Sequence, residues 1–444
     1  MPRLFGTDGI RGVANIELKP TTAYALGRAV AHSLADGGGA IVVGQDTRRS
    51  GDLFVAAITA GATSLGTDVH QVGVVPTPAL AFLAGSGRYA AGIMVSASHN
   101  PASDNGLKVL DRHGLKLDDP VEDELEQLIW RTEELPGVGN DELGVMVDAR
   151  DGVAAYTEAR MGIAARLDAS DLRIVLDAAN GSGGAFAPGI LAATGAAVEV
   201  INATPDGSNI NRACGATDPA GLATIVAERR ADVGFALDGD ADRLIAVDAT
   251  GRVVDGDQVL GILALERLAR GALAGRTLVV SVLSNGGLQQ AVEAAGGTVV
   301  RTPVGDKYIL EGMLVAGAGL GGEKSGHVII ADHTTSGDGI VTALEVLRVM
   351  IESGRSLADL AADIELLPQQ QRAVRVRHKD QWEGDPVIQR AIASARERLG
   401  DVGRILIRPS GTEPALRVMV EGPDALIVAE LADTLAAVAE ERLH

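Results

Sequence analysis

The sequence predicts an α/β fold: three related α/β domains with mostly parallel mixed sheets, followed by a smaller α+β domain, around a central cleft. Two patterns lead to this prediction. A succession of strand, turn, helix and strand occurs three times, and the last part of the chain instead shows alternating strands and a long final helix. At roughly 150 residues per domain, the 444 residues predict about three domains, with a wide range.

Each repeat opens with an apolar run, rich in β-branched residues, that ends at Gly, Asn, Asp or Ser, which is typical of a buried strand entering a turn. The opening strands are expected at 40–43, 173–176 and 277–280. Helices are then expected at 52–65, 185–194 and 288–295, each ending before a glycine. Second strands are expected at 69–75, 198–201 and 299–302. Strands joined through a helix favour parallel pairing.

The repeats, and the change of pattern after residue 370, define the expected domains. Their boundaries are 1–150, 151–252, 253–366 and 371–444. Residues 366–371, Leu-Leu-Pro-Gln-Gln-Gln, are expected to form a linker. The last domain is expected to hold strands near 374–376, 404–407 and 416–420, and a helix over 424–442.

Composition limits the classes of partner. The formal net charge is −20, so we expect neither nucleic acid nor a membrane surface as a partner. A few arginines focused in one cleft can still bind an anionic small molecule. The single cysteine, Cys214, excludes an intramolecular disulfide and fits a reducing compartment. The start of the chain lacks an apolar signal segment, and the expected location is cytoplasmic.

A serine-rich loop follows the expected strand at 91–95. Residues 96–101 read Ser-Ala-Ser-His-Asn-Pro, and a nucleophile loop and an ordinary capped turn explain them about equally well. The loop is not a Gly-x-Ser-x-Gly elbow, which disfavours an acyl-transferring hydrolase. Ser98 can instead carry a phosphoryl group, provided that a metal ion and cationic side chains neutralise the charge.

An acidic loop follows the expected strand at 233–237. Asp238, Asp240 and Asp242 occupy every second position and are separated by small residues. Their carboxylates can converge on one hard cation such as Mg²⁺, which prefers oxygen ligands. The remaining ligands of an EF-hand are missing. A solvated acidic turn is the alternative, and it is less favoured because the three charges repel each other.

Two further loops offer groups that bind sugars and phosphates. Residues 322–327, Gly-Glu-Lys-Ser-Gly-His, suit hydrogen bonds to vicinal hydroxyls. Residues 408–414, Arg-Pro-Ser-Gly-Thr-Glu-Pro, together with Arg417, are typical of a phosphate cradle, with a surface turn as the alternative. Lys108 lies ten residues after Ser98 in a chain with only six lysines, and Arg11 lies between glycines near the start.

These loops, in this order, resemble those of the α-D-phosphohexomutase superfamily along the whole chain. The opening residues 5–12, Phe-Gly-Thr-Asp-Gly-Ile-Arg-Gly, and residues 335–339, Thr-Ser-Gly-Asp-Gly, resemble the bacterial phosphoglucosamine mutase subgroup more than the glucose or mannose subgroups. Two positions depart from the usual pattern. Ala241 stands where glycine is frequent, and Lys307 stands where arginine is usual, which loses a planar fork of donors.

The resemblance implies a role for each loop. Ser98 is the implied phosphoserine, and it binds Mg²⁺ together with Asp238, Asp240 and Asp242. Glu323 and Ser325 are the implied contacts to the sugar. The remaining implied residues fall into two groups. One group holds the non-reacting phosphate: Arg408, Ser410, Gly411, Thr412 and Arg417. The other consists of charged residues of the active site: Arg11, Lys108, Arg243 and His327. Of these, Lys108 and His327 are the candidates for acid–base roles.

The resemblance also implies a reaction. Glucosamine 6-phosphate and glucosamine 1-phosphate are interconverted through the phosphoserine, with glucosamine 1,6-bisphosphate as intermediate and primer, feeding UDP-N-acetylglucosamine and cell-wall synthesis. A phosphoglucomutase or phosphomannomutase is the alternative within the class. A metal-dependent serine phosphatase and a non-catalytic phosphosugar-binding protein are more distant ones. The expected partner is a small phosphosugar, and monomer and homodimer both stay open.

Overall fold

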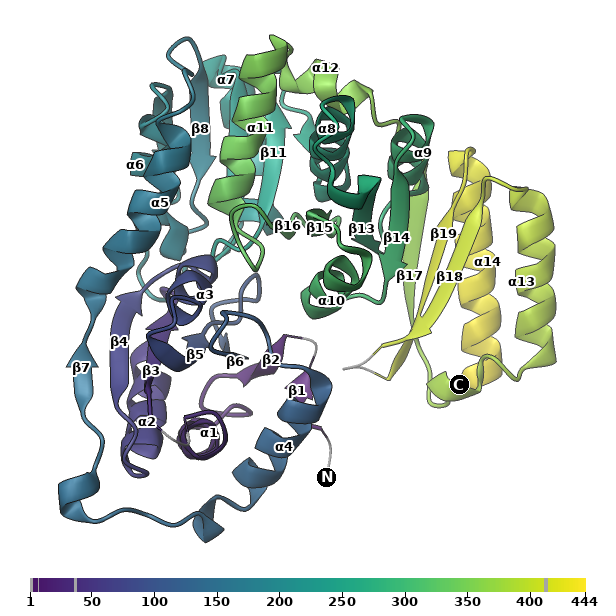
Figure 1. The fold of residues 1–444 in the computed structure, drawn as a ribbon. Helices are drawn as coiled ribbons and strands as arrows, with labels where there is room; N and C mark the ends of the chain where they lie inside the picture. The colour runs from purple at the N-terminus through teal and green to yellow at the C-terminus, as the bar shows by residue number, and fades with distance from the viewer. Residues whose placement is uncertain (1–2, 7, 36–37, 411–413) are drawn as a thin grey trace. The chain divides into compact units, whose positions relative to one another are not determined.

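The computed structural model describes residues 3–6, 8–35, 38–410 and 414–444 (Figure 1). The chain forms two compact units. The first comprises Met1–Leu283 with Ala295–Asp363, and the second comprises Ser284–Ala294 with Ile364–His444. None of the helices in the described part of the chain is both long enough and apolar enough to cross a membrane.

The first sheet of the larger unit has seven strands in the order β1-β2-β6-β5-β3-β4-β7. They are β1 (Phe5–Gly6), β2 (Gly9–Val13), β3 (Ala40–Gln45), β4 (Val69–Val74), β5 (Tyr89–Val95), β6 (Asp104–Leu110) and β7 (Met146–Asp148). The accompanying helices are α1 (Pro20–Ser33), α2 (Gly51–Thr63), α3 (Thr77–Ala84) and α4 (Asp119–Trp130). Both faces of β3 are covered: Ile41 and Val43 pack with α1 and α2, whereas Val42 packs with α3. This follows from the period-two alternation of a strand.

The second and third sheets repeat the parallel centre on a smaller scale. The second, ordered β12-β11-β10-β8-β9, contains β8 (Arg173–Asp177), β9 (Ala197–Ile201), β10 (Val233–Leu237), β11 (Leu244–Asp248) and β12 (Val253–Val254), with α5 (Ala154–Ala164), α6 (Ala187–Ala192) and α7 (Ala220–Arg229). The third, ordered β14-β13-β15-β16, contains β13 (Thr277–Ser281), β14 (Thr298–Thr302), β15 (Leu320–Gly322) and β16 (Val328–Ile330), with α8 (Gly256–Ala269), α10 (Asp306–Ala316), α11 (Gly339–Ser353) and α12 (Leu357–Ala362). The predicted fold class is therefore confirmed for this unit.

One feature of topology positions all three candidate loops. In each sheet a strand of the parallel centre is followed by an antiparallel neighbour, and these pairs are β5–β6, β10–β11 and β15–β16. The serine loop, the acidic loop and the Glu323 loop are the three reversals between those strands. The antiparallel strands were missed from sequence, because the repeat pattern ends at the loops that precede them.

The smaller unit is an antiparallel sheet, ordered β17-β19-β18, and two of its helices, α13 and α14, pack on one face of it (Figure 1). It contains β17 (Gln369–Arg375), β18 (Arg404–Pro409), β19 (Ala415–Glu421), α9 (Gly286–Ala294), α13 (Pro386–Leu399) and α14 (Ala425–Leu443). The predicted linker at 366–371 is wrong in its second half, because Gln369 begins β17 and pairs with Glu421. The hydrogen bonds between strands use only backbone groups, so these polar side chains do not prevent pairing. At the edge of the sheet the side chains can stay in solvent.

A charged cluster joins α11 to α8. Glu345 on α11 is almost fully buried and accepts from Arg348 Nε at 3.1 Å, and Arg267 Nη2 lies 3.5 Å from it. Burial by itself raises the pKa of the Glu345 carboxyl. The hydrogen bond from His333 and the charges of Arg348 and Arg267 outweigh burial and lower this pKa to about 2.

From the lowered pKa of Glu345 we expect the protein to lose stability in acid. A carboxyl with a lowered pKa stabilises the folded state above its unfolded pKa, near 4.5, and that contribution is lost as the pH falls toward 2. Glu345→Gln is expected to lower the free energy of unfolding by about 1–3 kcal/mol at pH 7. The difference between the variant and the original protein should narrow below pH 4.5, as measured from thermal midpoints at pH 7, 5 and 3.5.

Glu352→Gln is the matched control, since Glu352 lies on the same helix and pairs with Arg348 at 2.7 Å, but its side chain is 48% exposed. Its effect should stay within about 0.5 kcal/mol. A gap between Glu345→Gln and the original protein that is equal at every pH would contradict the assignment.

Candidate active site

Ser98 lies in a constrained turn after β5. It is fully buried, and its backbone φ of 50° is in the left-handed region. A non-glycine residue there is strained by roughly 1–2 kcal/mol, and such strain tends to gather at functional sites. Ser98 Oγ donates a hydrogen bond to Asp238 Oδ2 at 2.7 Å, across 140 residues of sequence. The serine loop and the acidic loop therefore meet.

The acidic loop folds so that its three carboxylates converge. Asp238, Asp240 and Asp242 are all buried, and one oxygen from each lies within 4.8 Å of the others. The turn is fixed by the backbone, because Ala241 N–H donates to Asp238 O at 3.1 Å and Ala241 takes a φ of 56°. Ala241 therefore adopts the left-handed conformation without glycine.

The carboxylates of this loop fit a divalent metal ion. Buried oxygens Oδ1 of Asp240 and Asp242 have no hydrogen-bond partner among the described residues. Burial raises the pKa of Asp238, and the charges of Asp242 and Asp240 raise it further, so it lies well above its usual value. A hard cation would satisfy the open oxygens and remove this repulsion. The sequence prediction of a convergent acidic site thus agrees with the geometry.

Two cationic side chains lie against the acids. Lys108 on β6 is buried, and its Nζ lies 2.9 Å from Asp240 Oδ2 and 3.6 Å from Asp242 Oδ2. Burial lowers the pKa of Lys108, but the charges of Asp240, Asp8 and Asp242 outweigh it and raise the pKa. Arg243 approaches from the other end, with Nε 3.9 Å from Asp238 Oδ2. Both residues were predicted from sequence.

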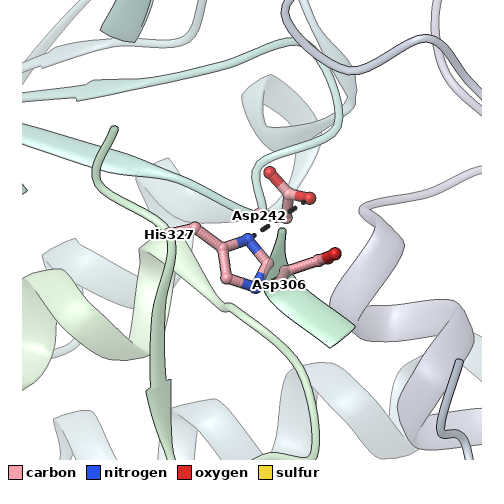
Figure 2. Close-up of side chains that lie close together, drawn as sticks. All are labelled: Asp242, Asp306 and His327. Carbon is pink, nitrogen blue, oxygen red and sulfur yellow. Dashed lines mark ion pairs between the residues drawn. The ribbon is translucent and has the colours of Figure 1, made fainter. Parts of the chain in front are cut away.

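His327 is held between two carboxylates (Figure 2). Its Nδ1 lies 3.6 Å from Asp242 Oδ2, and its Nε2 lies 3.8 Å from Asp306 Oδ2. Burial lowers the pKa of His327, but the hydrogen bond and charge of Asp242 and the charge of Asp306 raise it overall. Gly337 N–H donates to Nε2 at 3.1 Å, which opposes full protonation. In this geometry Nε2 accepts a hydrogen bond and Nδ1 faces Asp242.

The loop that carries Gly337 is anchored deep in the protein. The carboxylate of Asp338 caps α11 and accepts from Tyr156 Oη at 3.0 Å and Arg160 Nη2 at 3.1 Å, and all three side chains are buried. Next to it, Gly339 N–H donates to Ala241 O at 3.0 Å. This loop therefore supports His327 and the acidic loop together.

Comparisons with known proteins agree with this arrangement. Four family models match: phosphoglucomutase/phosphomannomutase domain I over residues 2–136, domain II over 153–251, domain III over 255–366 and the C-terminal domain over 373–438. A relative from Moorella thermoacetica, named phosphoglucosamine mutase, is 49% identical over 96% of each chain. The chain belongs to the phosphoglucomutase/phosphomannomutase family. The resemblance to α-D-phosphohexomutases is thereby confirmed.

Solved structures of other family members share the fold. A phosphoglucomutase/phosphomannomutase family protein from Burkholderia thailandensis has a TM-score of 0.82 and 26% identity, covering 99% of this chain and 98% of that one. An N-acetylphosphoglucosamine mutase from Aspergillus fumigatus, described in complex with GlcNAc-6P and magnesium, has a TM-score of 0.69 and 20% identity, with 99% and 96% covered. The second likeness concerns the fold alone.

Three charged residues of this family member were not predicted as site residues. Asp8, Lys116 and Asp306 form a chain of ion pairs, in which Lys116 Nζ contacts a carboxylate on each side. Asp8 in turn contacts the predicted Arg11, whose Nη1 donates to Asn100 Oδ1 at 3.0 Å in the serine loop. The scarcity of lysine, which pointed to Lys108, could also have pointed to Lys116.

The predicted sugar loop is the turn between β15 and β16. Glu323 is partly buried, and its Oε1 accepts from Gly305 N–H at 3.1 Å. Ser325 Oγ is buried and has no hydrogen-bond partner within the described part of the chain. Lys307, the departure from the family pattern, is engaged by α4, with Nζ 3.1 Å from Glu122 Oε2 and in contact with Asp119.

The predicted phosphate cradle lies in the smaller unit, where Arg408 on β18 pairs in register with Arg417 on β19. Ser410 is buried and its carbonyl accepts from Lys379 Nζ at 2.6 Å. Gly411 and Thr412 lie outside the described residues. The cradle therefore stays a prediction.

Gly239 allows the close contact between the two loops. A Cβ there would lie 2.7 Å from Ser98 O and 2.6 Å from Ile210 Cδ1. Gly239→Ala is therefore expected to push the serine loop off the acids and lower kcat/KM by about 10–100-fold, since small misplacements of reacting groups are costly. Steady-state kinetics of the phosphosugar reaction measure this.

Gly162→Ala serves as the control, because a Cβ at Gly162 in α5 meets no atom within 4 Å among the described residues. This variant should keep full activity and fold at least as stably. Equal activities of the two alanine variants would disprove the steric argument.

Proposed function

We propose that the protein interconverts glucosamine 6-phosphate and glucosamine 1-phosphate through a phosphoserine at Ser98, with Mg²⁺ as the metal ion. The observation that carries the proposal is the 2.7 Å hydrogen bond from Ser98 Oγ to Asp238 within a buried group of three carboxylates. Relatives 45–49% identical over nearly their full length, all named phosphoglucosamine mutase, support the substrate class.

The proposed reaction has two balanced transfers. In the first, the bond from Ser98 Oγ to phosphorus breaks and a bond from phosphorus to the sugar O1 forms, while the O1 proton leaves to a base. Ser98 Oγ takes up a proton in that step. The bisphosphorylated sugar then turns, the bond from phosphorus to O6 breaks and a bond from phosphorus to Ser98 Oγ forms. The Ser98 proton leaves to a base, O6 takes up a proton, and glucosamine 1-phosphate is released. Glucosamine 1,6-bisphosphate is both the intermediate and the primer that phosphorylates an empty Ser98.

The side chains around Ser98 have different roles in the proposed reaction. Asp238, Asp240 and Asp242 would hold Mg²⁺, which neutralises charge on the transferring group when bound. Lys108, kept as an ammonium ion by its acidic neighbours, adds positive charge beside the acidic loop. Arg243 and Arg11 add positive charge, and Lys108 and His327 are the candidates for the acid–base roles. Glu323 and Ser325 are the proposed contacts to the sugar, and the loop at 408–417 is the proposed holder of the second phosphate.

The relatives favour a mutase over a serine phosphatase, since those compared are named phosphoglucosamine mutase. The burial of Ser98, Asp238 and Asp240 agrees with a site that keeps bulk water from the phosphoserine. A non-catalytic binder needs neither the serine nor the orphaned carboxylate oxygens. Within the mutases, comparing kcat/KM for glucosamine 6-phosphate, glucose 6-phosphate and mannose 6-phosphate tests the C2 preference. A higher kcat/KM for either competitor would refute the proposed substrate.

Removal of the nucleophile tests the covalent step. Ser98→Ala is expected to lower mutase turnover by at least about 10⁴-fold, because the phosphoryl acceptor is gone. Binding of the sugar phosphate, measured by calorimetry, should change little. Ser103→Ala, at an exposed serine of the same loop, should keep full activity. Turnover by Ser98→Ala would exclude the phosphoserine mechanism.

Removal of a carboxylate tests the metal site. Asp242→Asn is expected to weaken Mg²⁺ binding by about 10–100-fold, because it removes one charged ligand. The measurement is a Mg²⁺ titration of activity after chelation, with parallel calorimetry of the metal alone. Unchanged Mg²⁺ affinity would remove the 238–242 loop from the metal site.

A further inference from the structure

The turn after β3 contains a buried ion pair that the proposed reaction does not use directly. The side chains of Asp46 and Arg48 have no exposed surface, and Arg48 Nε donates to Asp46 Oδ2 at 2.9 Å. The backbone N–H of Arg48 donates to Asp46 Oδ1 at the same distance. Burying two charges is costly unless their remaining groups are also hydrogen-bonded. The groups that accept hydrogen bonds from the other guanidinium donors therefore indicate what this buried pair supports.

The other four donors of Arg48 all face carbonyl groups of the serine loop. Nη2 donates to Ser98 O at 2.9 Å and to Asn100 O at 2.8 Å. Nη1 donates to Asp104 O at 3.0 Å and also contacts Pro101 O. A guanidinium has five N–H groups, so every donor of Arg48 is used. One side chain thus binds four backbone carbonyls of the loop that carries Ser98.

Asp46, the other partner of the ion pair, is linked through Ser96 to the backbone N–H of Ser98. Ser96 Oγ donates to Asp46 Oδ2 at 2.7 Å and accepts from Ser98 N–H at 2.9 Å. Both peptide groups of Ser98 are therefore tied to Asp46 and Arg48. This is the residue whose φ of 50° is strained, and a strained conformation persists only where its surroundings hold it.

We infer that Arg48, oriented by Asp46, is a positioning residue for phosphoryl transfer, because it holds Ser98 in the left-handed conformation that directs Oγ to Asp238. The inference rests on the proposed function. Lysine cannot replace this arginine, since an ammonium group has three donors and no planar fork. Arg48 touches neither the acids nor, in the proposed reaction, the sugar, so its effect is on the transfer step.

The test compares Arg48→Lys with Arg49→Lys. Arg49 is the neighbouring residue with an exposed side chain, and its variant should behave like the original protein. For Arg48→Lys, kcat is expected to fall about 10–100-fold while KM for the sugar phosphate changes less than about threefold. The rate at which glucosamine 1,6-bisphosphate phosphorylates Ser98, followed by intact mass, should fall in parallel. An unchanged kcat, or a rise in KM alone, would overturn the inference.

Ser96→Ala provides a second route if Arg48→Lys fails to fold. It removes only the hydroxyl that links Asp46 to Ser98 N–H, and its kcat and phosphorylation rate should fall with KM retained. Full activity of Ser96→Ala, with Arg48→Lys either unfolded or fully active, would overturn the inference. The proposed function is tested separately on the original protein. If that protein shows no mutase turnover, the proposed function is wrong, whatever the variants do.

Discussion

Mutual repulsion among Asp238, Asp240 and Asp242 is the constraint on which the rest of the active site depends. Three carboxylates converge in a buried loop, where charge is poorly screened. Lys108 and Arg243 neutralise them in part, and a buried hydroxyl, Thr77 Oγ1, donates to Asp240 Oδ2 at 2.6 Å. The open oxygens of Asp240 and Asp242 fit a cation, and Ser98, which contacts Asp238 of the same loop, would then lie beside that positive charge.

The topology explains why loops so distant in sequence can serve one site. Each of three sheets reverses direction after a strand of its parallel centre, and each reversal carries one set of polar groups. Contacts then join segments of different sheets. Ser98 Oγ donates to Asp238 Oδ2 at 2.7 Å, Thr77 N–H at the start of α3 donates to Asp240 O at 2.9 Å, and Leu244 N–H at the start of β11 donates to Gly326 O at 3.0 Å. The acidic loop in the second sheet is the common partner, and the other two loops are built against it.

Rigidity is supplied by buried polar networks rather than by apolar packing alone. Asp338 with Arg160 and Tyr156 holds the loop behind His327, and Asp46 with Arg48 holds the loop that carries Ser98. In both cases a buried carboxylate orients an arginine and caps or braces a turn. Such networks are costly to bury, and their full hydrogen bonding makes the turns they support conformationally specific.

Local periodicity and the chemistry of short motifs were enough to predict the repeating strand–helix pattern, the fold class and the polar loops. Ser98, Lys108 and the three aspartates were predicted as site residues in this way, and Arg243 was predicted from the resemblance to the family. The contacts among them, the pairing of Lys116 with Asp8 and Asp306, and the use of all five Arg48 donors were decided only by the tertiary structure. Those contacts join residues up to 190 positions apart, and neither local pattern nor residue type specifies which distant carboxylate or carbonyl a buried cation will face.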